Sequence, residues 1–331
     1  MDLYLQHEDA FRAFITQDRE VRAVFAMAER LAPTGLPVLV RGEMGTGKEL
    51  LSHIIHHLSG RPGQLWIENV AGLEDTLFTD TLVGHRAGAF TGADTDAPGL
   101  IKRAAGGTLF LDEIGDLSPR SQIALVHILE NSSYFPLGSD EPETANTRFI
   151  FSTNADLERR LVEGTFREDL FFRLCGHELY LPPLRSRPGD IPLIAAALME
   201  DMGARMNPPV TGLSESVRTV FSRYSWPGNV RELKAVVLHG ILSCTGTEVE
   251  LSHIQGFNER ISGLIEQYQT GSDESWEVSL PADGLPTLDE GTEQLIEEAL
   301  RRAQGNQRRA AKLLGITPGA LSQRLRRAKE R

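Results

Sequence analysis

The chain has 331 residues, and its 34 Lys and Arg against 46 Asp and Glu give a formal net charge of −12. A content of 40% hydrophobic and 24% charged residues is typical of a folded protein and excludes a chain that is disordered throughout. The N-terminus lacks a secretory leader, the apolar stretch at 192–199 is too short to span a membrane, and two cysteines are too few for a disulfide or zinc framework, so we expect a cytoplasmic protein.

Short apolar runs alternate with helical patterns over the first half of the chain. Each run is bounded by Gly, Pro or polar residues, which is typical of buried parallel strands. These predicted strands are VLV at 38–40, LWI at 65–67, TLFL at 108–111 and RFIFST at 148–153. The pattern predicts an α/β fold, and amphipathic helical segments from Ile191 to about Gly263 predict a smaller helical domain behind it.

A glycine-rich loop, GEMGTGKE at 42–49, follows the first predicted strand and precedes a helical segment. Its glycines allow backbone turns that point N–H groups at phosphate oxygens, and Lys48 adds a positive charge at a helix N-terminus. Strand, loop and helix in this order predict a nucleoside triphosphate site. The usual hydroxyl ligand for Mg²⁺ after the lysine is replaced by Glu49.

The segment GHRAGAFTGA at 84–93 is flanked by glycines and carries one aromatic residue, Phe90, and one hydroxyl, Thr91. A flexible surface turn is one interpretation of this composition. A phenylalanine exposed at such a tip is costly unless it meets a partner, which favours a contact loop.

A second acidic motif, GGTLFLDEIGDL at 106–117, is an apolar strand that ends in Asp112 and Glu113. A strand that ends at a nucleotide crevice can give one carboxylate to the metal and use the other to orient water. Together with Lys48, this pair predicts a nucleoside triphosphatase.

The charge of the chain changes sign near its end. Residues 261–300 contain ten acidic and no basic residues, whereas 301–331 contain ten basic residues and one acid, Glu330. The Gly, Ser, Pro and acid-rich stretch at 270–286 is typical of a linker. The basic tail is therefore expected to meet a polyanion.

Residues 287–331 are predicted to form three helices, the second capped by Asn306 and ended by Gly315, the third capped by Thr317. The turn between them is typical of a helix-turn-helix. The first helix is amphipathic, with apolar Leu288, Leu295, Ile296, Ala299 and Leu300. The expected small core consists of Ala310, Leu313, Leu314, Ile316, Leu321 and Leu325. A solvated basic hairpin that binds nothing is the alternative.

Five motifs in order resemble the bacterial enhancer-binding proteins, AAA+ ATPases that activate transcription by σ54 RNA polymerase. They are GEMGTGKE, GAFTGA at 88–93, GGTLFLDE, FREDLFFRL at 166–174 and WPGNVREL at 226–233, and GNQRRAAKLLGI resembles the family's Fis-type tail. The resemblance implies an AAA+ P-loop NTPase core with a parallel sheet at 1–180, a helical lid at 181–265, a linker at 266–286 and a three-helix, Fis-type helix-turn-helix domain at 287–331.

The resemblance also implies roles for residues around ATP and Mg²⁺. The expected nucleotide-binding residues are Gly42, Glu43, Gly45, Thr46, Gly47, Lys48, Glu49, which is usual in this family, and Arg231 of the lid. Asp112 would hold Mg²⁺ and Glu113 would position water, with Asn69 restraining Glu113 and Asn154 sensing the γ-phosphate. Arg167 and Arg173 would reach a neighbouring subunit's nucleotide. Surface ion pairs with Glu168 and Asp169 are the alternative for these arginines.

Partner contacts follow from the same resemblance. The residues expected to contact σ54 are Gly88, Ala89, Phe90, Thr91, Gly92 and Ala93, and those expected to bind DNA are Thr317, Gly319, Ser322, Gln323, Arg326 and Arg327. Two positions depart from the family pattern. Arg86 stands where an acid is frequent, and 134–148 lacks the usual basic, glycine-rich sequence of the second pore-facing loop.

The implied function is a σ54-dependent activator that binds enhancer-like double-stranded DNA, assembles from dimers into a hexameric ring and remodels the closed σ54 RNA polymerase holoenzyme. The alternatives are a DNA-binding regulator or repressor of the same fold without remodelling, and an AAA+ machine such as a loader or unfoldase. The resemblance starts near Phe14, which leaves no room for an N-terminal sensory domain. Control by a separate inhibitor protein or by abundance is therefore expected, as in phage-shock activators.

Overall fold

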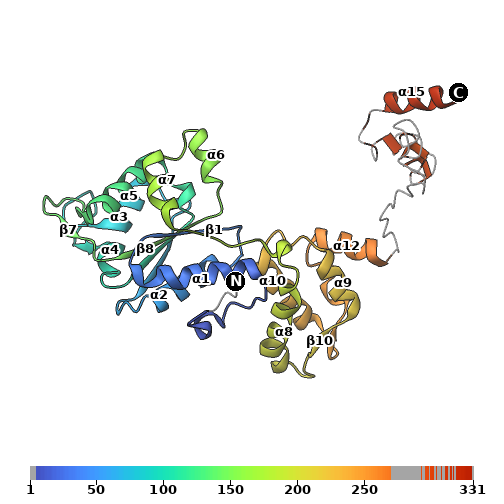
Figure 1. Cartoon of the computed structure of the whole chain (residues 1–331), viewed down its shortest axis with the longest axis horizontal. Helices are drawn as coiled ribbons and strands as arrows, with labels where there is room; N and C mark the ends of the chain where they lie inside the picture. Colours follow the sequence, from blue (N-terminus) through green and yellow to red (C-terminus); the bar gives the residue numbers. More distant parts are fainter. Residues whose placement is uncertain are drawn as a thin grey trace. The chain divides into compact units, whose positions relative to one another are not determined.

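The computed structural model describes residues 5–269 and, towards the C-terminus, residues 292, 295–297, 299–301, 303, 307, 310–311, 314, 316 and 318–329 (Figure 1). The chain forms two compact units, Met1–Thr270 and Gly271–Arg331. In the part of the chain that is described, no helix is both long and apolar enough to cross a bilayer.

A five-stranded parallel sheet forms the centre of the first unit, with the order β2-β5-β8-β1-β9. Its strands are β1 (Val38–Arg41), β2 (Leu65–Asn69), β5 (Thr108–Asp112), β8 (Arg148–Thr153) and β9 (Glu178–Tyr180). The four predicted strands are confirmed. The edge strand β9 was not predicted, because only one of its three residues, Leu179, is buried.

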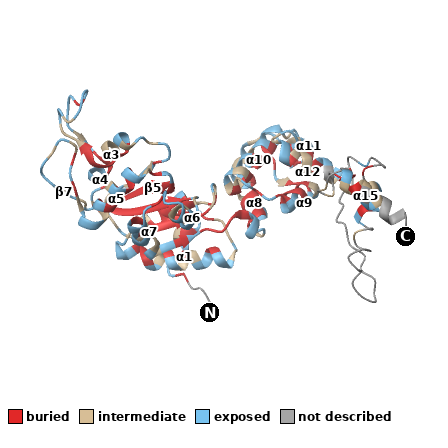
Figure 2. Ribbon diagram, turned by 90° about the horizontal axis from the view of Figure 1, so that it is seen from above, coloured by how far each residue is buried: buried red, intermediate tan, exposed pale blue. Residues whose placement is uncertain are grey.

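Alternation along the strands gives the sheet two separate cores (Figure 2). In β1, Leu39 packs into one core, whereas Val38 and Val40 pack into the other. In β8, Phe149 and Phe151 face the first core and Ile150 the second. Because side chains of successive strand residues point to opposite faces, a sheet with apolar residues at every position must be covered by helices on both sides.

Helices cover both faces of the sheet. They are α1 (Arg19–Leu31), α2 (Lys48–Leu58), α3 (Asp75–Val83), α4 (Leu100–Arg103), α5 (Pro119–Asn131), α6 (Leu157–Val162) and α7 (Glu168–Leu174). Residues of α1 and α2 contribute to one core, and residues of α3, α4, α5 and α7 to the other. Two antiparallel strand pairs extend from the α3 side, β3 (Gly84–His85) with β4 (Ala97–Pro98) and β6 (Ser133–Tyr134) with β7 (Glu143–Thr144).

The predicted smaller helical domain is also confirmed. Its helices are α8 (Asp190–Met202), α9 (Glu215–Arg223), α10 (Asn229–Ser243), α11 (Leu251–Ile254) and α12 (Glu259–Gln269). The fully buried Trp226 lies in its core and donates from the indole Nε1 to the Phe221 carbonyl at 2.9 Å. A short parallel pair, β10 (Gly212–Leu213) with β11 (Glu248–Val249), is an addition that the helical pattern did not indicate.

The second unit contains α15 (Pro318–Lys329) and a small apolar core. The core consists of Ile296, Ala299, Ala303, Ala310, Ala311 and Leu321, with Leu300, Leu314, Ile316 and Leu325 packed against it. The core predicted for the helix-turn-helix is thereby confirmed at the described positions. Leu295, placed on the apolar face of the first helix, is instead 42% exposed. Leu288, Asn306, Leu313, Gly315 and Thr317 lie outside the described residues.

Candidate functional site

The glycine-rich loop joins β1 to α2 at the carboxyl end of the sheet, where open α/β sheets bind ligands. Gly45 and Gly47 have φ of +79° and +108°, which glycine adopts without strain. A Cβ on Gly45 would lie 2.3 Å from the Gly228 carbonyl oxygen, and one on Gly47 would lie 2.7 Å from the Phe14 ring. The lid and the N-terminal segment therefore approach the loop so closely that only glycine fits.

Lys48 begins α2 and is almost completely buried at the centre of the loop. Its Nζ donates to the carbonyls of Gly42 at 2.9 Å and Glu43 at 3.4 Å, and lies 3.6 Å from Glu113 Oε1. The buried Thr46 donates from Oγ1 to the same Glu43 carbonyl at 2.9 Å. The ammonium group is thus held inside the curve of the loop, where a phosphate needs a cation.

The other two side chains at this loop point elsewhere. The Glu43 carboxylate accepts two hydrogen bonds from Arg185, at 2.5 and 2.7 Å, which hold the pKa of Glu43 below its usual value. Glu49 is exposed in the first turn of α2. The Glu43 carboxylate is therefore bound by Arg185 and not by Lys48.

The acidic pair lies beside Lys48, at the end of β5. Asp112 accepts a hydrogen bond from the Ser152 hydroxyl of β8, and the Asn69 amide lies 3.5 Å from its other oxygen. Glu113 has a left-handed backbone, φ +61°, and its carboxylate accepts from the backbone N–H of Asn154 at 2.9 Å. Three neighbouring strands thus bring together Asn69, Asp112, Glu113 and Asn154, as the sequence predicted.

One contact differs from the expected arrangement. The Asn69 amide contacts Asp112 and its oxygen accepts from the Ala71 N–H, so this residue touches the carboxylate next to the expected one. Its register explains the difference, because Asn69 and Asp112 are directly paired in the sheet. A restraint of Asn69 on Glu113 stays a prediction.

The donor set around Asp112 fits Mg²⁺ bound together with a nucleotide. Within the described ranges, no three His, Cys, Asp or Glu side chains lie close enough to hold a metal by themselves. Mg²⁺ does not need such a cage, because it takes one or two carboxylates and completes its shell with phosphate oxygens and water. Asp112, at the edge of the loop that would hold the phosphates, meets this requirement.

The two arginines of the FREDLFFRL segment lie on the surface. Arg167 pairs with Asp169 at 2.7 Å, and Arg173 pairs with Glu130 of α5 at 3.0 Å. The first pair matches the alternative of local ion pairing, whereas the second joins two helices and does not involve Glu168. The side chains are 42% and 37% exposed, so both arginines remain accessible to a neighbouring molecule.

The lid arginine, Arg231, is exposed in the first turn of α10. Its Cβ lies 3.0 Å from the position that a Cβ on Gly45 would take, so this turn of the lid lies directly against the loop. Two further residues here were not predicted from the sequence, Arg185 and Asn229, which contact Glu43 from 142 and 186 residues away. Asn229 stands inside the WPGN motif, two positions before the arginine that drew attention.

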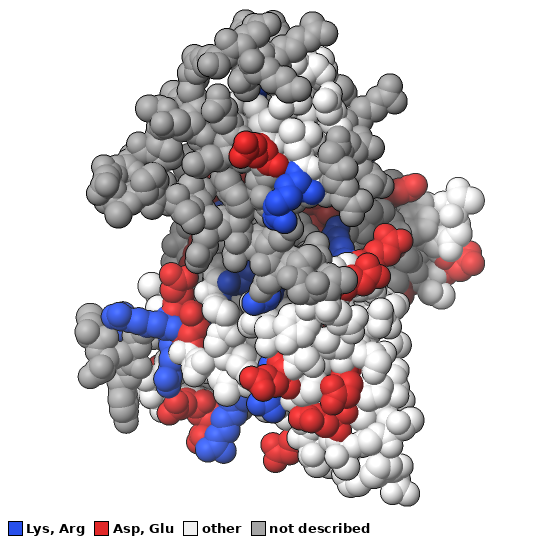
Figure 3. All heavy atoms as spheres, turned by 90° about the vertical axis from the view of Figure 1, so that its right-hand side faces the viewer, with Lys and Arg blue, Asp and Glu red and all other residues white. Residues whose placement is uncertain are grey.

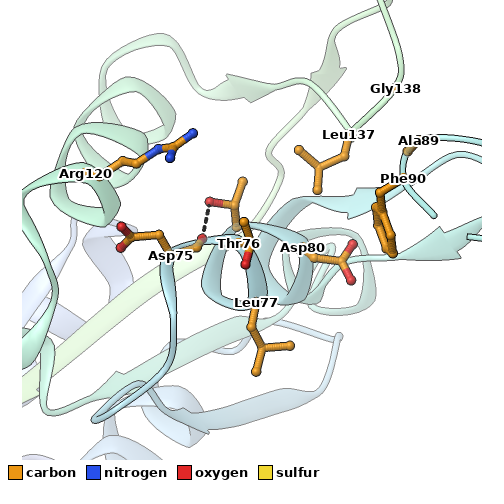
Figure 4. Close-up of a pocket in the computed structure, with 10 residues that line it drawn as sticks. Asp75, Thr76, Leu77, Asp80, Ala89, Phe90, Arg120, Leu137 and Gly138 are labelled. Atoms are coloured by element: carbon orange, nitrogen blue, oxygen red, sulfur yellow. Dashed lines mark hydrogen bonds between the residues drawn. The ribbon is translucent and has the colours of Figure 1, made fainter. Parts of the chain in front are cut away.

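The GAFTGA segment forms the tip of a loop whose base is the β3–β4 pair. Gly88 donates from its N–H to the Ala93 carbonyl at 2.8 Å, which closes the tip. Phe90 is 46% exposed at this tip, beside a pocket of about 530 Å³ whose lining includes Asp75, Leu77 and Asp80 of α3 (Figure 4). The segment is therefore a built loop with an accessible aromatic tip.

Arg86 connects this loop to the 134–148 segment. It pairs with Asp96 of the same loop at 2.8 Å and with Glu143 of β7 at 3.1 Å. Its backbone N–H also donates to the Leu137 carbonyl at 2.9 Å. The basic residue that departs from the family pattern therefore joins the two loops.

Part of the expected DNA-binding face is described. Gly319 is exposed in α15, and the Ser322 hydroxyl lies 3.4 Å from Gln307 Oε1. Thr317 lies outside the described residues, as do the side chains of Gln323, Arg326 and Arg327. Acidic and basic side chains are interspersed on the described surface seen in Figure 3.

Comparison with protein families divides the chain into three matched segments. The Sigma-54 interaction domain matches residues 14–180, the AAA+ ATPase lid domain matches 185–261, and the Fis family of bacterial regulatory proteins matches 293–327. The first segment contains the loop, the acidic pair, the GAFTGA tip and both surface arginines.

Known relatives agree with this division. The chain is 38% identical over 308 residues to the hydrogenase transcriptional regulatory protein HoxA of Cupriavidus necator, covering 92% of this chain and 63% of HoxA. It is 37% identical over 304 residues to the Psp operon transcriptional activator of Escherichia coli, covering 89% of this chain and 91% of that protein. The chain thus spans less than two thirds of HoxA but most of the Psp activator.

A similar fold occurs in NtrX from Brucella abortus, solved in complex with ATP, with a TM-score of 0.67 and 24% identity over 95% of this chain and 68% of NtrX. The fold, the order of the motifs and the matched segments agree. The chain therefore belongs to the bacterial enhancer-binding proteins, the family that carries the Sigma-54 interaction domain.

Proposed function

We propose that this protein is a σ54-dependent transcriptional activator that binds and hydrolyses ATP and uses the energy to remodel the closed σ54 RNA polymerase complex. The observation that carries the proposal is the convergence of Lys48, Asp112 and Glu113 at the carboxyl end of the sheet. The similarity to the Psp operon transcriptional activator, and to NtrX solved with ATP and with ADP, supports it.

In the proposed site, Lys48 exchanges its contacts with the Gly42 and Glu43 carbonyls for the β- and γ-phosphates of ATP. Asp112 is the protein ligand of Mg²⁺, which neutralises charge on the phosphate oxygens when it is bound with the nucleotide. Glu113 accepts a proton from the attacking water. The Asn154 N–H, at 2.9 Å, holds the Glu113 carboxylate near the position where a γ-phosphate would lie.

The proposed oligomer supplies what a single chain lacks. The ion pairs that hold Arg167 and Arg173 are exposed, and such pairs contribute only about 0–1 kcal/mol, so exchanging them for a neighbour's phosphate costs little. A guanidinium that reaches the transferring phosphoryl group stabilises the charge that develops there. We therefore propose dimers that assemble into a hexameric ring with active sites between subunits.

Partner contacts complete the proposal. The Phe90 tip contacts σ54, the basic tail binds enhancer DNA in the cytoplasm, and a separate inhibitor protein is one means of control. Residues 1–180, 181–265, 266–286 and 287–331 serve as ATPase core, lid, linker and DNA-binding domain. Only the tail carries a strong excess of positive charge, which favours it as the DNA contact.

The oligomeric ATPase is tested by measuring specific activity against protein concentration. Activity per subunit should rise steeply as rings assemble, and Glu113→Gln should lower turnover by about 100-fold or more while ADP binding persists. Specific activity that stays constant over the concentration range would exclude a site shared between subunits.

The σ54 contact is tested with Thr91→Ala, which lies at the tip and away from Lys48. This variant should keep its ATPase activity and lose transcription activation and the binding of σ54 in the presence of ADP and aluminium fluoride. If activation survived, a DNA-binding regulator of the same fold without remodelling would be the better assignment.

A further inference from the structure

Three consecutive carbonyls of the phosphate-binding loop each accept a hydrogen bond from further along the chain. Two donors lie at the start of α10 in the lid, and the third is Arg187, just before α8. The Met44 carbonyl accepts from Asn229 Nδ2, and the Gly45 carbonyl accepts from the Val230 N–H, both at 3.0 Å. The Thr46 carbonyl accepts from Arg187 Nη2, also at 3.0 Å. Every donor lies more than 140 residues further along the chain than its acceptor.

These contacts bear on the N–H groups of the loop. In a trans peptide the C=O and the following N–H point in opposite directions, so a carbonyl held towards the lid turns its N–H partner to the other side of the loop. The N–H of Thr46 confirms the direction, because it points to the Glu43 carbonyl at 3.4 Å, the same acceptor that Lys48 Nζ contacts at 3.4 Å. The N–H side of the loop therefore faces the lysine.

The burial, backbone conformation and hydrogen bonds of Asn229 all fit its contact with the loop. It is fully buried and has a left-handed backbone, φ +52°, which asparagine tolerates better than most residues. Its Oδ1 accepts from the Leu184 N–H at 2.7 Å, which fixes the orientation of the amide. Its Nδ2 then donates to the Met44 carbonyl at 3.0 Å and to the Glu43 carboxylate at 3.2 Å. A residue that served only packing would need neither the buried amide nor the unusual backbone.

Arg187 is a second buried polar residue that donates to a carbonyl of the loop. Its guanidinium is completely buried, lies 5.5 Å from the Phe14 ring centre and approaches Asp190 at 3.5 Å. Its Nε and Nη1 have no hydrogen-bond partner within the described structure, so the Thr46 carbonyl receives its one hydrogen bond. The buried ion pair with Asp190 offsets part of the cost of burying this guanidinium, and the hydrogen bond to the Thr46 carbonyl joins it to the loop.

Asp190 extends this connection to the N-terminal segment. Its carboxylate accepts from the Thr16 hydroxyl at 2.6 Å and from the Gln17 N–H at 2.8 Å. The ring of Phe14, just before these residues, lies against Gly47 and below Arg187. The pair Arg187–Asp190 therefore contacts both the phosphate-binding loop, through Arg187, and the N-terminal segment, through Asp190.

We propose that Asn229 and Arg187 are positioning residues that hold the loop carbonyls towards the lid and thereby aim the loop N–H groups at the nucleotide phosphates. This inference rests on the proposed ATP site. It makes phosphate affinity depend on the position of the lid. When the lid lies against the loop, the loop N–H groups point at the bound phosphates. When the lid moves away, the three carbonyls lose their donors and the affinity for ADP falls.

The test uses the full chain and competition of ADP and of AMP against a fluorescent ADP analogue. Asn229→Gly removes the amide and keeps the backbone, because glycine adopts φ +52° readily. Arg187→Met removes the donor and keeps apolar bulk beside Phe14. Arg205→Gln is the control, since it removes an exposed arginine of the same lid that pairs with Asp201.

Asn229→Gly and Arg187→Met should each weaken ADP binding about tenfold, which is the effect of one oriented hydrogen bond. The affinity of each variant for AMP should stay within about twofold of that of the unmodified chain. Each should raise the KM for ATP more than it lowers kcat, whereas Arg205→Gln should keep the kcat and KM of the unmodified chain. The two variants remove separate hydrogen bonds, so misfolding of one, seen in its melting temperature, leaves the other decisive.

Other results would overturn the inference. An unchanged ADP affinity in a variant that folds normally would show that the carbonyl contacts do not aim the loop. An equal loss for AMP and ADP would show a general effect on the lid. If the unmodified chain bound neither ADP nor ATP, the proposed nucleotide site would fall first and this inference with it.

Discussion

The ring of Phe90, at the tip of the GAFTGA loop, packs edge-on against His85 at the base of the same loop, with 4.9 Å between the ring centres. His85 is fixed in turn by Asp80 of α3, whose carboxylate lies 2.6 Å from Nδ1. His85 therefore connects the Phe90 ring at the tip to Asp80 of α3 in the same subunit.

Asp80→Asn should loosen this arrangement, because a neutral amide makes a weaker hydrogen bond to the imidazole than an ionised carboxylate does. Hydrogen exchange followed by mass spectrometry should show at least about threefold faster exchange in 84–93, with the sheet strands unchanged. Asp94→Asn, an exposed change in the same loop, is the control and should leave the exchange unaltered. Equal exchange in the two variants would show that His85 does not restrain Phe90.

Mixing two inactive variants tests whether the active site is shared between subunits. Glu113→Gln and Arg173→Ala should each be nearly inactive, because one lacks the proposed base and the other lacks the arginine offered to a neighbour. An equal mixture should recover roughly a quarter of full ATPase activity, since about one subunit pairing in four joins an intact Glu113 to an intact Arg173. A mixture that is no more active than its components would place both residues in the same site of a single chain.

The partly buried thiol of Cys175 gives a prediction about pH. Burial, assisted by the nearby Glu178, raises the pKa of Cys175 to about 11. A raised thiol pKa leaves little thiolate near neutrality, and the reactive fraction grows about tenfold with each pH unit up to that pKa. In a Cys244→Ser background, the iodoacetamide reaction rate should therefore still rise between pH 9 and 10. A rate that levels off near pH 9 would contradict the raised pKa.

Arg148 is expected to contribute to stability rather than to chemistry. Its buried guanidinium donates to the carbonyls of Leu31 and Ala32, the latter contact being very short, and so connects the central strand β8 to the end of α1. Arg148→Met leaves these carbonyls without their donor and should lower the free energy of unfolding by about 2 kcal/mol in urea titrations. Arg159→Met, at the exposed Arg159–Glu163 pair, should cost less than about 0.5 kcal/mol. Similar losses in both variants would show that burial of Arg148 adds nothing.

Local chemistry explains which parts of the molecule could be predicted from the sequence. The strands β1, β5 and β8 are apolar on both faces, so their signal is continuous, whereas β9 buries one residue and gives none. Lys48 follows β1 at the end of the glycine-rich loop, and Asp112 and Glu113 stand at the end of β5. Parallel strands end at the same edge of a sheet, so the convergence of these residues could be predicted. Leu295 is exposed although it was assigned to the apolar side of its helix, because an apolar period does not show how far along the helix its neighbours cover that side.

The contacts between lid and loop could not be found in this way. Asn229 and Arg187 donate to backbone carbonyls, which every residue has, so nothing in the composition of the loop indicates that it needs donors from so far along the chain. The same holds for Asn69, whose partner depends on strand register and not on residue type. Sequence motifs identify the groups that touch a ligand more readily than those that hold them in place.

The two ion pairs of Arg86 have a mechanical consequence. Because Arg86 joins Asp96 on one side and Glu143 on the other, and because the backbone beside it is hydrogen-bonded to Leu137, the GAFTGA loop and the β6–β7 hairpin are braced against each other. Backbone hydrogen bonds in both directions, from Arg86 to Leu137 and from Leu137 to Gly84, add to these ion pairs, so we expect a displacement of the GAFTGA loop to move the hairpin with it.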